Sequence, residues 1–191
     1  MSEDGVQVWV RHLDARESAR QTVRALLADY LGIRIESIGI REGPGGRPGL
    51  ESGSGDFSIS HAGDVVAVAA VRQGRVGIDA EFSDRSLPLA AMARDHFTAA
   101  EAQRVTESAC PGEMFYRIWT AKEAFLKAAG LGLGFGMDQI ETGATADGGV
   151  TIQSVCGMAS LARGWRLSHQ ERSIDGRRLV VAVVNGPQSS P

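Results

Sequence analysis

The chain has 191 residues, 43% of them hydrophobic and 23% charged, which is typical of a globular protein and not of a disordered one. Its net charge of −3 argues against general nucleic-acid binding, which needs a basic surface. No apolar run reaches the roughly 18 residues of a membrane span, and the acidic residues 1–4 do not resemble a secretory signal. The two cysteines have no Cys-x-x-Cys spacing, so we expect free thiols, no zinc site and a cytoplasmic protein.

The sequence of the first part of the chain predicts several strands and one helix. Residues 6–13 alternate apolar and polar side chains, as a strand does. A helix is expected to begin at Asp14, with Glu17 at capping-box spacing, and to end at Gly32. Its buried face is expected to contain Ala15, Ala19, Val23, Leu26, Leu27, Tyr30 and Leu31. Residues 33–41 predict a strand and residues 42–55 a loop, followed by strands at 57–60, 65–71 and 76–82.

The second part is predicted to begin with helices. Residues 89–97 form a short helix with Pro88 near its first turn, and Thr98 caps the next helix with Glu101 three positions later. Residues 113–129 predict the longest helix, which the Gly-rich residues 130–136 end. Strands are expected at 150–155, 165–170 and 178–184, and the tail 188–191 is expected to be disordered.

Two segments share an order of residue types. Residues 57–71 (FSISHAGDVVAVAAV) and 165–184 (WRLSHQERSIDGRRLVVAVV) both contain an aromatic, Ser-His and then a Val-rich strand. We interpret them as parts of two similar halves, residues 1–85 and 86–191, arranged as a pseudo-dimer. Because the strands and helices lack regular βαβ spacing, the predicted fold class is α+β.

Asp79 and Glu81 are the first candidate site residues. Residues two apart in a strand point to one face, so the two carboxylates are expected side by side, where a cation would relieve their repulsion. Oxygen ligands of this kind suit Mg²⁺. The alternative is the exposed edge of an amphipathic strand.

The helix predicted at 113–129 adds three charged residues. Glu123 and Lys127 are four positions apart and share a broad face with Lys122; the two lysines are the only ones in the chain. One interpretation is a surface ion pair. The other is a third carboxylate between two ammonium groups that neutralise phosphate oxygens, as phosphoryl transfer requires.

Two further motifs suit a phosphate contact. Ser60-His61 lies at the end of a predicted strand before Gly63, although a lone His at a turn is more often structural. Arg47 lies in a Gly-rich loop stiffened by Pro48 and would bind phosphate in a forked geometry. A solvated loop arginine is the alternative.

Four of these blocks together resemble the 4′-phosphopantetheinyl transferases of the surfactin-synthetase-activating type. The blocks are Gly46-Arg47-Pro48, the FSISH run at 57–61, the VGIDAE run at 76–81, and FYRIWTAKEAFLK at 115–127. A familiar link, FTAAE at 97–101, lies between the third and the fourth block. The resemblance covers roughly residues 10–185.

The resemblance implies transfer of the phosphopantetheine arm of coenzyme A to a serine of an acyl or peptidyl carrier protein, with release of adenosine 3′,5′-bisphosphate. It also implies two similar halves with the site at their interface. Mg²⁺ would be held by Asp79, Glu81 and Glu123, and Lys127 would contact the pyrophosphate. Coenzyme A would be contacted by Arg20, Arg47, Ser60, His61 and Lys122.

Several points stay open at this level. Either Glu123 or a water on the metal would remove the serine proton. The carrier and its pathway, polyketide, peptide or fatty acid, are not defined by the sequence. Arg47 stands where the family usually has Lys, which keeps the charge. A monomer is expected, because the small trimeric holo-carrier synthases are about half this length. The alternative function is a module that binds coenzyme A or a carrier without catalysis.

Overall fold

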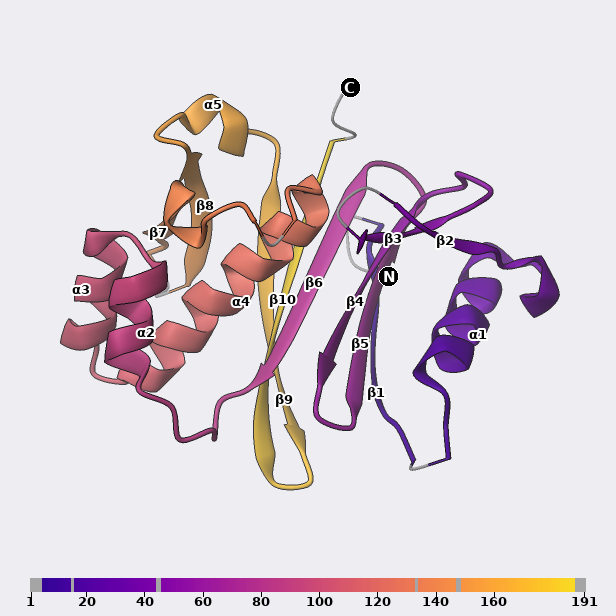
Figure 1. Cartoon of the computed structure of the whole chain (residues 1–191), viewed down its shortest axis with the longest axis horizontal. Helices are drawn as coiled ribbons and strands as arrows, with labels where there is room; N and C mark the ends of the chain where they lie inside the picture. The colour runs from indigo at the N-terminus through magenta and orange to yellow at the C-terminus, as the bar shows by residue number, and fades with distance from the viewer. Residues whose placement is uncertain (1–4, 15, 44–45, 133, 147–148, 188–191) are drawn as a thin grey trace.

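The computed structural model describes residues 5–14, 16–43, 46–132, 134–146 and 149–187. The fold is mixed α/β and contains two three-stranded antiparallel sheets, β1-β5-β4 and β6-β10-β9, and two small two-stranded sheets, β2-β3 and β7-β8. Helix α4 covers one face of the β6-β10-β9 sheet, and α1 lies on the outer side of the β1-β5-β4 sheet (Figure 1). Within the described residues, no helix is both long and apolar enough to cross a membrane.

The first sheet and its helix come from the first part of the chain. Helix α1 packs Val23 and Leu27 onto Phe57 and Val68 of the sheet. The bounds are β1 Gln7–His12, α1 Ala19–Leu31, the 3₁₀ turn η1 Ile35–Ser37, β2 Ile40–Glu42, β3 Pro48–Leu50, β4 Asp56–Ala62 and β5 Val65–Val71.

The second sheet and three helices follow. Strand β6 lies within the first predicted half but pairs with β10. The bounds are β6 Arg75–Phe82, α2 Leu89–His96, α3 Ala99–Glu107, α4 Pro111–Ala129, the 3₁₀ turn η3 Met137–Gln139, β7 Ile140–Ala144, β8 Val150–Val155, α5 Ala159–Ala162, β9 Arg166–Ile174 and β10 Arg177–Gly186.

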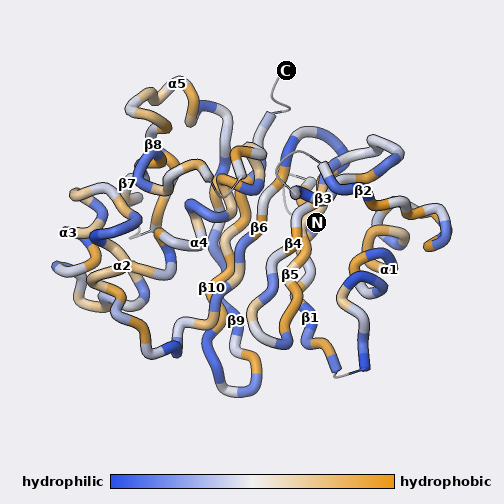
Figure 2. Tube along the Cα trace, viewed as in Figure 1, coloured by the Kyte–Doolittle hydropathy of each residue, from blue (hydrophilic) through white to orange (hydrophobic). Residues whose placement is uncertain are grey.

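The core between the two large sheets is built from small and β-branched residues. Alternate residues of β5 face alternate residues of β6 and β10, and Ala67, Ile78 and Val181 are fully buried there. Figure 2 shows β5 and β10 hydrophobic along most of their length. A strand buried on both faces needs such a continuous apolar run.

The strong sequence signals are confirmed. Strands β1, β4, β5, β6, β8, β9 and β10 lie where alternation or Val-rich runs predicted them. Thr98 and Glu101 form a complete capping box at α3. Gly32 ends α1 and Gly130 ends α4, both with positive φ, a conformation that suits glycine.

The segments before β4 differ from the prediction. Helix α1 begins at Ala19 after Ser18, not at Asp14; the Glu17 N–H instead donates to the Asp14 carbonyl (2.8 Å), ahead of the helix. Residue 15 lies outside the described residues. Residues 33–41 contain η1 and the start of β2 instead of one strand, and Ile33 and Ile35 are exposed. Apolar alternation indicates a strand only where one face becomes buried.

Strand β3, strand β7 and helix α5 were not predicted, nor was the turn η3. Strand β3 lies in the expected loop and pairs with β2, while β7 contains a register shift that breaks its alternation. Helix α5 has four residues, too few for a periodic signal. The predicted disordered tail, residues 188–191, lies outside the described residues.

Candidate active site

Asp79 lies at the centre of the candidate site, on β6 where it faces α4 and β4. It is 4% exposed. Its Oδ1 accepts hydrogen bonds from Lys127 Nζ (2.7 Å) and from the Ser60 hydroxyl (2.8 Å). Its Oδ2 is buried and has no hydrogen-bond partner among the described residues. A buried carboxylate oxygen without a partner is costly, so this atom is a candidate ligand for an added donor or cation.

Lys127 reaches Asp79 because α4 lies directly on β6. At Gly77 an added Cβ would be 1.9 Å from the Ala124 carbonyl oxygen, so only glycine permits this close approach. Besides Asp79, Lys127 Nζ donates to the Ile78 carbonyl (3.1 Å) and to the Ser60 hydroxyl (3.3 Å). The ammonium group is therefore fixed between α4, β4 and β6.

Ser60 and His61 do not act as one motif. The Ser60 hydroxyl is buried, donates to Asp79 and accepts from the Ala80 N–H (3.2 Å). His61 is the next residue of β4, so its side chain points to the other face of the strand, where it is exposed. The structure brings Ser60 to the site and leaves His61 on the face that carries Phe57.

Glu81 and Glu123 lie within electrostatic range of Asp79. Burial raises the pKa of both glutamates, and repulsion from Asp79 raises it further, while Lys127 lowers it. Arg85 also lowers the pKa of Glu81 through a half-exposed ion pair at 3.5 Å. Three carboxylates near one ammonium group leave an excess of negative charge, which favours a proton or a cation.

The three carboxylates are not arranged as a finished metal site. Across the described part of the chain, no three Asp, Glu, His or Cys side chains lie close enough together to hold a metal ion. The oxygen donors and the unpartnered Oδ2 of Asp79 nevertheless match the ligand type that Mg²⁺ prefers. The predicted metal role of Asp79, Glu81 and Glu123 stays a prediction.

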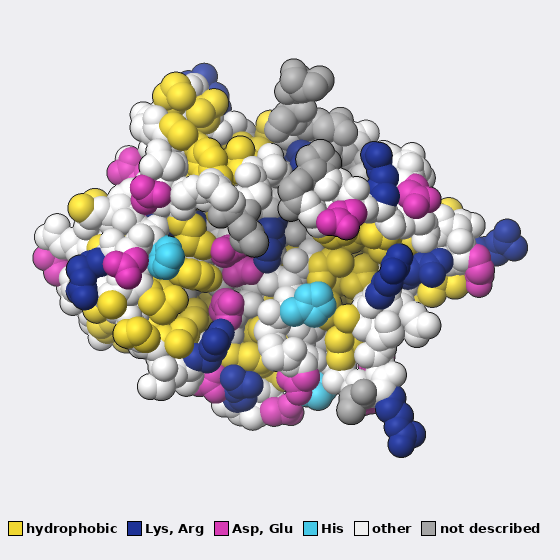
Figure 3. Space-filling view, viewed as in Figure 1, with side chains coloured by type: hydrophobic (Ala, Val, Ile, Leu, Met, Phe, Trp, Pro, Cys, Tyr) yellow, Lys and Arg dark blue, Asp and Glu magenta, His cyan; other side chains and the backbone are white. Residues whose placement is uncertain are grey.

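A pocket of about 230 Å³ begins beside these groups. Glu123 and Lys127 provide its charged end, and Leu126 and Ile59 give it apolar walls. The remaining lining residues come from the start of β3 and the loop before it, from β4 and from the residues after α4: Gly46, Arg47, Pro48, Ser58, Gly130 and Gly132. Figure 3 shows acidic and basic side chains in contact near the middle of this face, between two hydrophobic areas.

Arg47 has a different role from the one predicted. Its guanidinium forms a forked pair with Asp56 (2.7 and 2.8 Å) and also donates to the carbonyls of Lys127 (2.7 Å), Val76 (2.9 Å) and Phe57 (3.3 Å). A phosphate would have to displace these acceptors. Arg47 therefore joins β4, β6 and α4 from inside the structure, although its stem lines the pocket.

Lys122 does not lie at the site either. It is 0% exposed and pairs with Glu101 of α3, which is also 0% exposed, and its Nζ donates to the Met137 carbonyl (3.0 Å). Burial opposes ionisation of Glu101, but Lys122 and hydrogen bonds from Thr142 hold its pKa below the ordinary value. The expected coenzyme A contact is wrong for this residue, which joins α4 to α3 and β7.

Arg20 lies in the first turn of α1, where its side chain is exposed. No hydrogen bond or ion pair within the described residues connects it to Asp79, Lys127 or Ser60. The structure therefore does not bring it into the cluster.

Sequence reasoning missed Asp56 and Ser58, which complete the junction between β4 and β6. Ser58 accepts from the Ile78 N–H (3.1 Å), and Asp56 accepts from the Val76 N–H (2.9 Å). With Ser60 they form a row at every second position of β4. This period-two row of polar side chains was the available signal, but in the sequence it looks the same as the solvent-facing side of a half-buried strand.

Comparisons with protein families and with individual known proteins agree on one family. Residues 75–184 match the family model of the 4′-phosphopantetheinyl transferase superfamily. An L-aminoadipate-semialdehyde dehydrogenase-phosphopantetheinyl transferase of Mus musculus is 30% identical over 97% of this chain and 66% of its own length. A 4′-phosphopantetheinyl transferase of Bacillus pumilus is 30% identical over 74% of this chain and 61% of its own.

The matches differ in length from this chain. It spans about half to two thirds of the curated relatives. Among solved structures, a holo-[acyl-carrier-protein] synthase from Neisseria meningitidis is 23% identical with a TM-score of 0.44, over 58% of this chain and 96% of its own.

Proposed function

Because the chain belongs to the 4′-phosphopantetheinyl transferase superfamily, we propose that it transfers the 4′-phosphopantetheine arm of coenzyme A to a serine of an acyl or peptidyl carrier protein. The other product is adenosine 3′,5′-bisphosphate. We further propose that it is of the surfactin-synthetase-activating type, on the strength of the four sequence blocks that end in the long helix.

One observation supports this function most strongly. Asp79 keeps one buried oxygen without a partner, while its other oxygen is held by Lys127 and Ser60. Two glutamates with raised pKa values lie within range of it. An ammonium group beside several carboxylates, at the end of a pocket, is the arrangement that binding and cleaving a pyrophosphate needs.

Asp79, Glu81 and Glu123 would hold a Mg²⁺ ion. When bound, such an ion polarises phosphoryl oxygens and offsets the charge that develops on them. The carboxylates supply oxygen ligands, and the fixed ammonium of Lys127 adds a cation on the same side.

The reaction is a displacement at the β-phosphorus of coenzyme A. The serine oxygen forms a bond to this phosphorus, and the bond to the bridging oxygen breaks as the bisphosphate leaves. Lys127 would stabilise the negative charge that grows on the leaving group. Glu123, whose pKa burial raises, suits a proton acceptor for the serine hydroxyl; a water molecule in the site is the other candidate base.

The pocket beside Glu123 and Lys127 would hold coenzyme A. Its apolar walls at Leu126 and Ile59 suit the pantetheine arm, with the pyrophosphate at the charged end. Ser60 is placed to position Asp79 and Lys127. His61 is exposed on the same face of β4 as Ile59, so it would contact a part of coenzyme A that extends past Ile59 over that face.

The two halves, residues 1–85 and 86–191, are proposed to form a pseudo-dimer with the site at their junction. The two large sheets have matching strand orders, which supports two similar halves, and the second sheet takes its strand β6 from residues 1–85. A monomer would suffice, because β4, β6 and α4 of one chain supply all the charged groups. The two exposed free cysteines fit a reducing cytoplasmic location.

The test uses product release. The protein is incubated with coenzyme A, Mg²⁺ and an apo-carrier, and adenosine 3′,5′-bisphosphate is measured by chromatography. We expect release that requires both the carrier and Mg²⁺ and that Asp79→Asn abolishes. Binding of coenzyme A without any bisphosphate release would instead identify a non-catalytic binding module.

A further inference from the structure

The two large sheets have the same order and the same alignment of strands. In the first sheet, Val10 of β1 lies opposite Ala67 of β5, which lies opposite Ser60 of β4. In the second, Ile78 of β6 lies opposite Val183 of β10, which lies opposite Ser168 of β9. When Ser60-His61 of β4 is aligned with Ser168-His169 of β9, β4 corresponds to β9 and β1 corresponds to β6.

At one junction the edge of β6 is closed by side chains of β4. The outward N–H groups of β6 donate hydrogen bonds to side-chain oxygens of β4: Val76 to Asp56, Ile78 to Ser58 and Ala80 to Ser60 (2.9 to 3.2 Å). These three donors of β6 thus have side-chain acceptors, so this part of the edge offers no position for another strand.

The corresponding junction between β1 and β9 keeps one of these acceptors, Ser168 in the place of Ser60, and lacks the other two. The alignment places Val8 and Val10 of β1 where β6 has Val76 and Ile78, and places Gly164 and Arg166 where β4 has Asp56 and Ser58. Glycine has no side chain and arginine has no acceptor atom. Neither residue can therefore satisfy an outward N–H of β1.

The backbone groups of Val8 and Val10 do point outward. The Leu13 N–H donates to the Asp64 carbonyl on the β5 side (2.8 Å). Since alternate residues of an edge strand turn their backbone groups to opposite sides, Gln7, Trp9 and Arg11 bond to β5. The N–H and C=O groups of Val8 and Val10 face the other side, where no described residue bonds to them and β1 pairs with no further strand.

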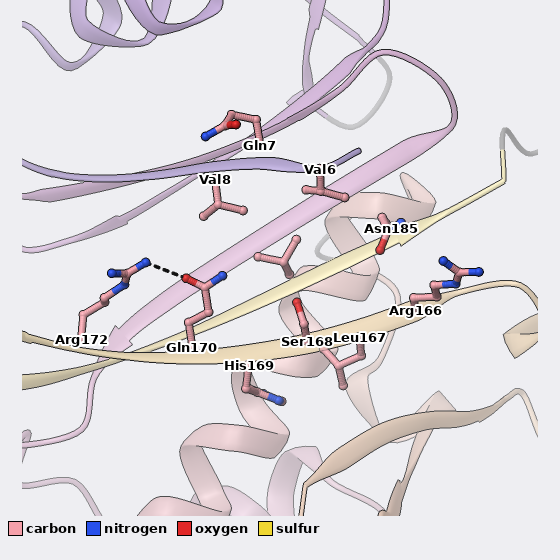
Figure 4. A pocket seen from close by; sticks show the side chains of 11 residues that line it. Val6, Gln7, Val8, Arg166, Leu167, Ser168, His169, Gln170, Arg172 and Asn185 are labelled. Carbon is pink, nitrogen blue, oxygen red and sulfur yellow. Dashed lines mark hydrogen bonds between the residues drawn. The ribbon is translucent and has the colours of Figure 1, made fainter. Parts of the chain in front are cut away.

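A groove of about 410 Å³ lies beside the Val8 end of this edge, and Val10 continues the edge beyond the groove. Figure 4 shows Val6 and Val8 on one side of it and Ser168 and Gln170 on the other, with Arg172 donating to the Gln170 amide oxygen (2.9 Å). The remaining lining residues are Gln7, Arg166, Leu167, His169, Val183 and Asn185. Among the described lining residues there is neither Asp nor Glu, and Arg172, whose printed partner is the neutral Gln170 amide, gives this part of the groove a positive charge.

We propose that this groove binds an extended, acidic peptide segment, which adds to β1 as an antiparallel strand. Val8 and Val10, two positions apart, each offer a donor and an acceptor, which is the repeat that an added antiparallel strand requires. Val8 and Val183 give the segment an apolar floor. A carboxylate on the segment would face Arg172, and a basic segment would be repelled.

The probe is a labelled peptide, acetyl-Glu-Val-Glu-Val-Glu-Val-amide, titrated into the intact protein and followed by fluorescence anisotropy. Two matched peptides separate the causes of binding. One carries N-methyl groups on alternate amides, which removes strand pairing but keeps the side chains. The other has Lys in place of Glu. We expect each change to weaken binding about tenfold or more.

Variants of the protein test the same surface. Val8→Pro removes only an outward N–H, which an edge strand tolerates, and should weaken binding of the first peptide about fivefold. Arg172→Glu should weaken it as well. Arg34→Glu, the same charge change on an exposed arginine before η1, should leave it unchanged.

Backbone amide chemical shifts show where the peptide lies. The proposal predicts the largest changes at Val8 and Val10. It is overturned if no binding is seen at about 1 mM peptide, if the N-methylated or Lys peptide binds equally well, or if the shifts centre on Glu123 and Lys127. A wild-type dimer that Val8→Pro converts to a monomer, with no peptide binding, would show that a second copy takes this edge and would also overturn it.

Discussion

The variant Lys127→Met distinguishes two roles for the Lys127 ammonium group, one in catalysis and one in a surface ion pair. The substitution keeps the apolar stem and removes the charge that holds Oδ1 of Asp79 at 2.7 Å. Asp79 stays 4% exposed, with the Ser60 hydroxyl as the remaining donor to Oδ1. A buried acceptor that loses such a partner costs about 1–3 kcal/mol. In a chain of this size each kcal/mol shifts Tm by about 2–4 °C, so Tm should fall by about 2–12 °C.

The kinetic effect should be larger than the effect on stability. The ammonium interacts most strongly when charge has grown on the leaving bisphosphate, so its loss should lower kcat more than it raises KM. Removal of one preorganised electrostatic group of this kind lowers kcat about hundredfold. The assay is steady-state bisphosphate release over a range of coenzyme A concentrations, with Tm measured by scanning calorimetry on the same preparation.

Two further variants supply the controls. Arg85→Met removes a half-exposed partner of Glu81 at 3.5 Å and should cost no more than about 1 kcal/mol. The double variant Asp79→Asn with Lys127→Met removes both charges, so it should regain most of the lost Tm while staying inactive. A wild-type kcat in Lys127→Met, or a Tm loss that the double variant does not recover, would refute the reasoning.

Three other predictions follow from the buried charges. Arg47→Ala should lower the free energy of unfolding by about 1–3 kcal/mol, because Asp56 loses its short ion pair and keeps only the longer one to Arg75 (3.8 Å); urea denaturation measures this, and a raised KM for coenzyme A at unchanged stability would contradict it. Lys122→Met should cost about 3–5 kcal/mol through Glu101, and adding Glu101→Gln should restore most of it; equal stability of the single variant and wild type would disprove the pair. Glu123 has a raised pKa when folded, so it reduces stability above that pKa and not below the unfolded value of about 4.3. With a chelator present, Glu123→Gln should therefore raise Tm at pH 7 and lose this gain below about pH 4. The variant should also abolish transfer. An unchanged or lower Tm at pH 7 would contradict the destabilising effect of the ionised Glu123.

The parts of the fold that the sequence predicts correctly are those with redundant local signals. The side chains of Thr98 and Glu101 each accept a hydrogen bond from the backbone N–H of the other residue within one helical turn. The Val-rich run of β5 has no polar face that could be exposed to solvent. By contrast, Ile33 and Ile35 alternate like strand residues and are nevertheless exposed. Alternation alone does not show whether another element covers a face.

The site residues illustrate the same limit for charged groups. Lys122 and Lys127 are five positions apart on one helix, yet one ammonium lies against Glu101 and the other against Asp79. Arg47 has the sequence context of a loop phosphate ligand and instead pairs with Asp56. A side chain's partner depends on which strand or helix packs beside it, and that is a tertiary property that spacing along the chain does not contain.

The central claim is that this chain moves a phosphopantetheine group onto a serine, and the intact mass of a carrier protein tests it most directly. An apo-peptidyl carrier is incubated with coenzyme A, Mg²⁺ and either the wild-type protein or Asp79→Asn, and a carrier with Ala in place of the acceptor serine serves as control. We predict a mass gain of one phosphopantetheine group with the wild type alone, and none on the control carrier. An unchanged carrier mass across several apo-carriers, with a protein that binds coenzyme A, would contradict the claim.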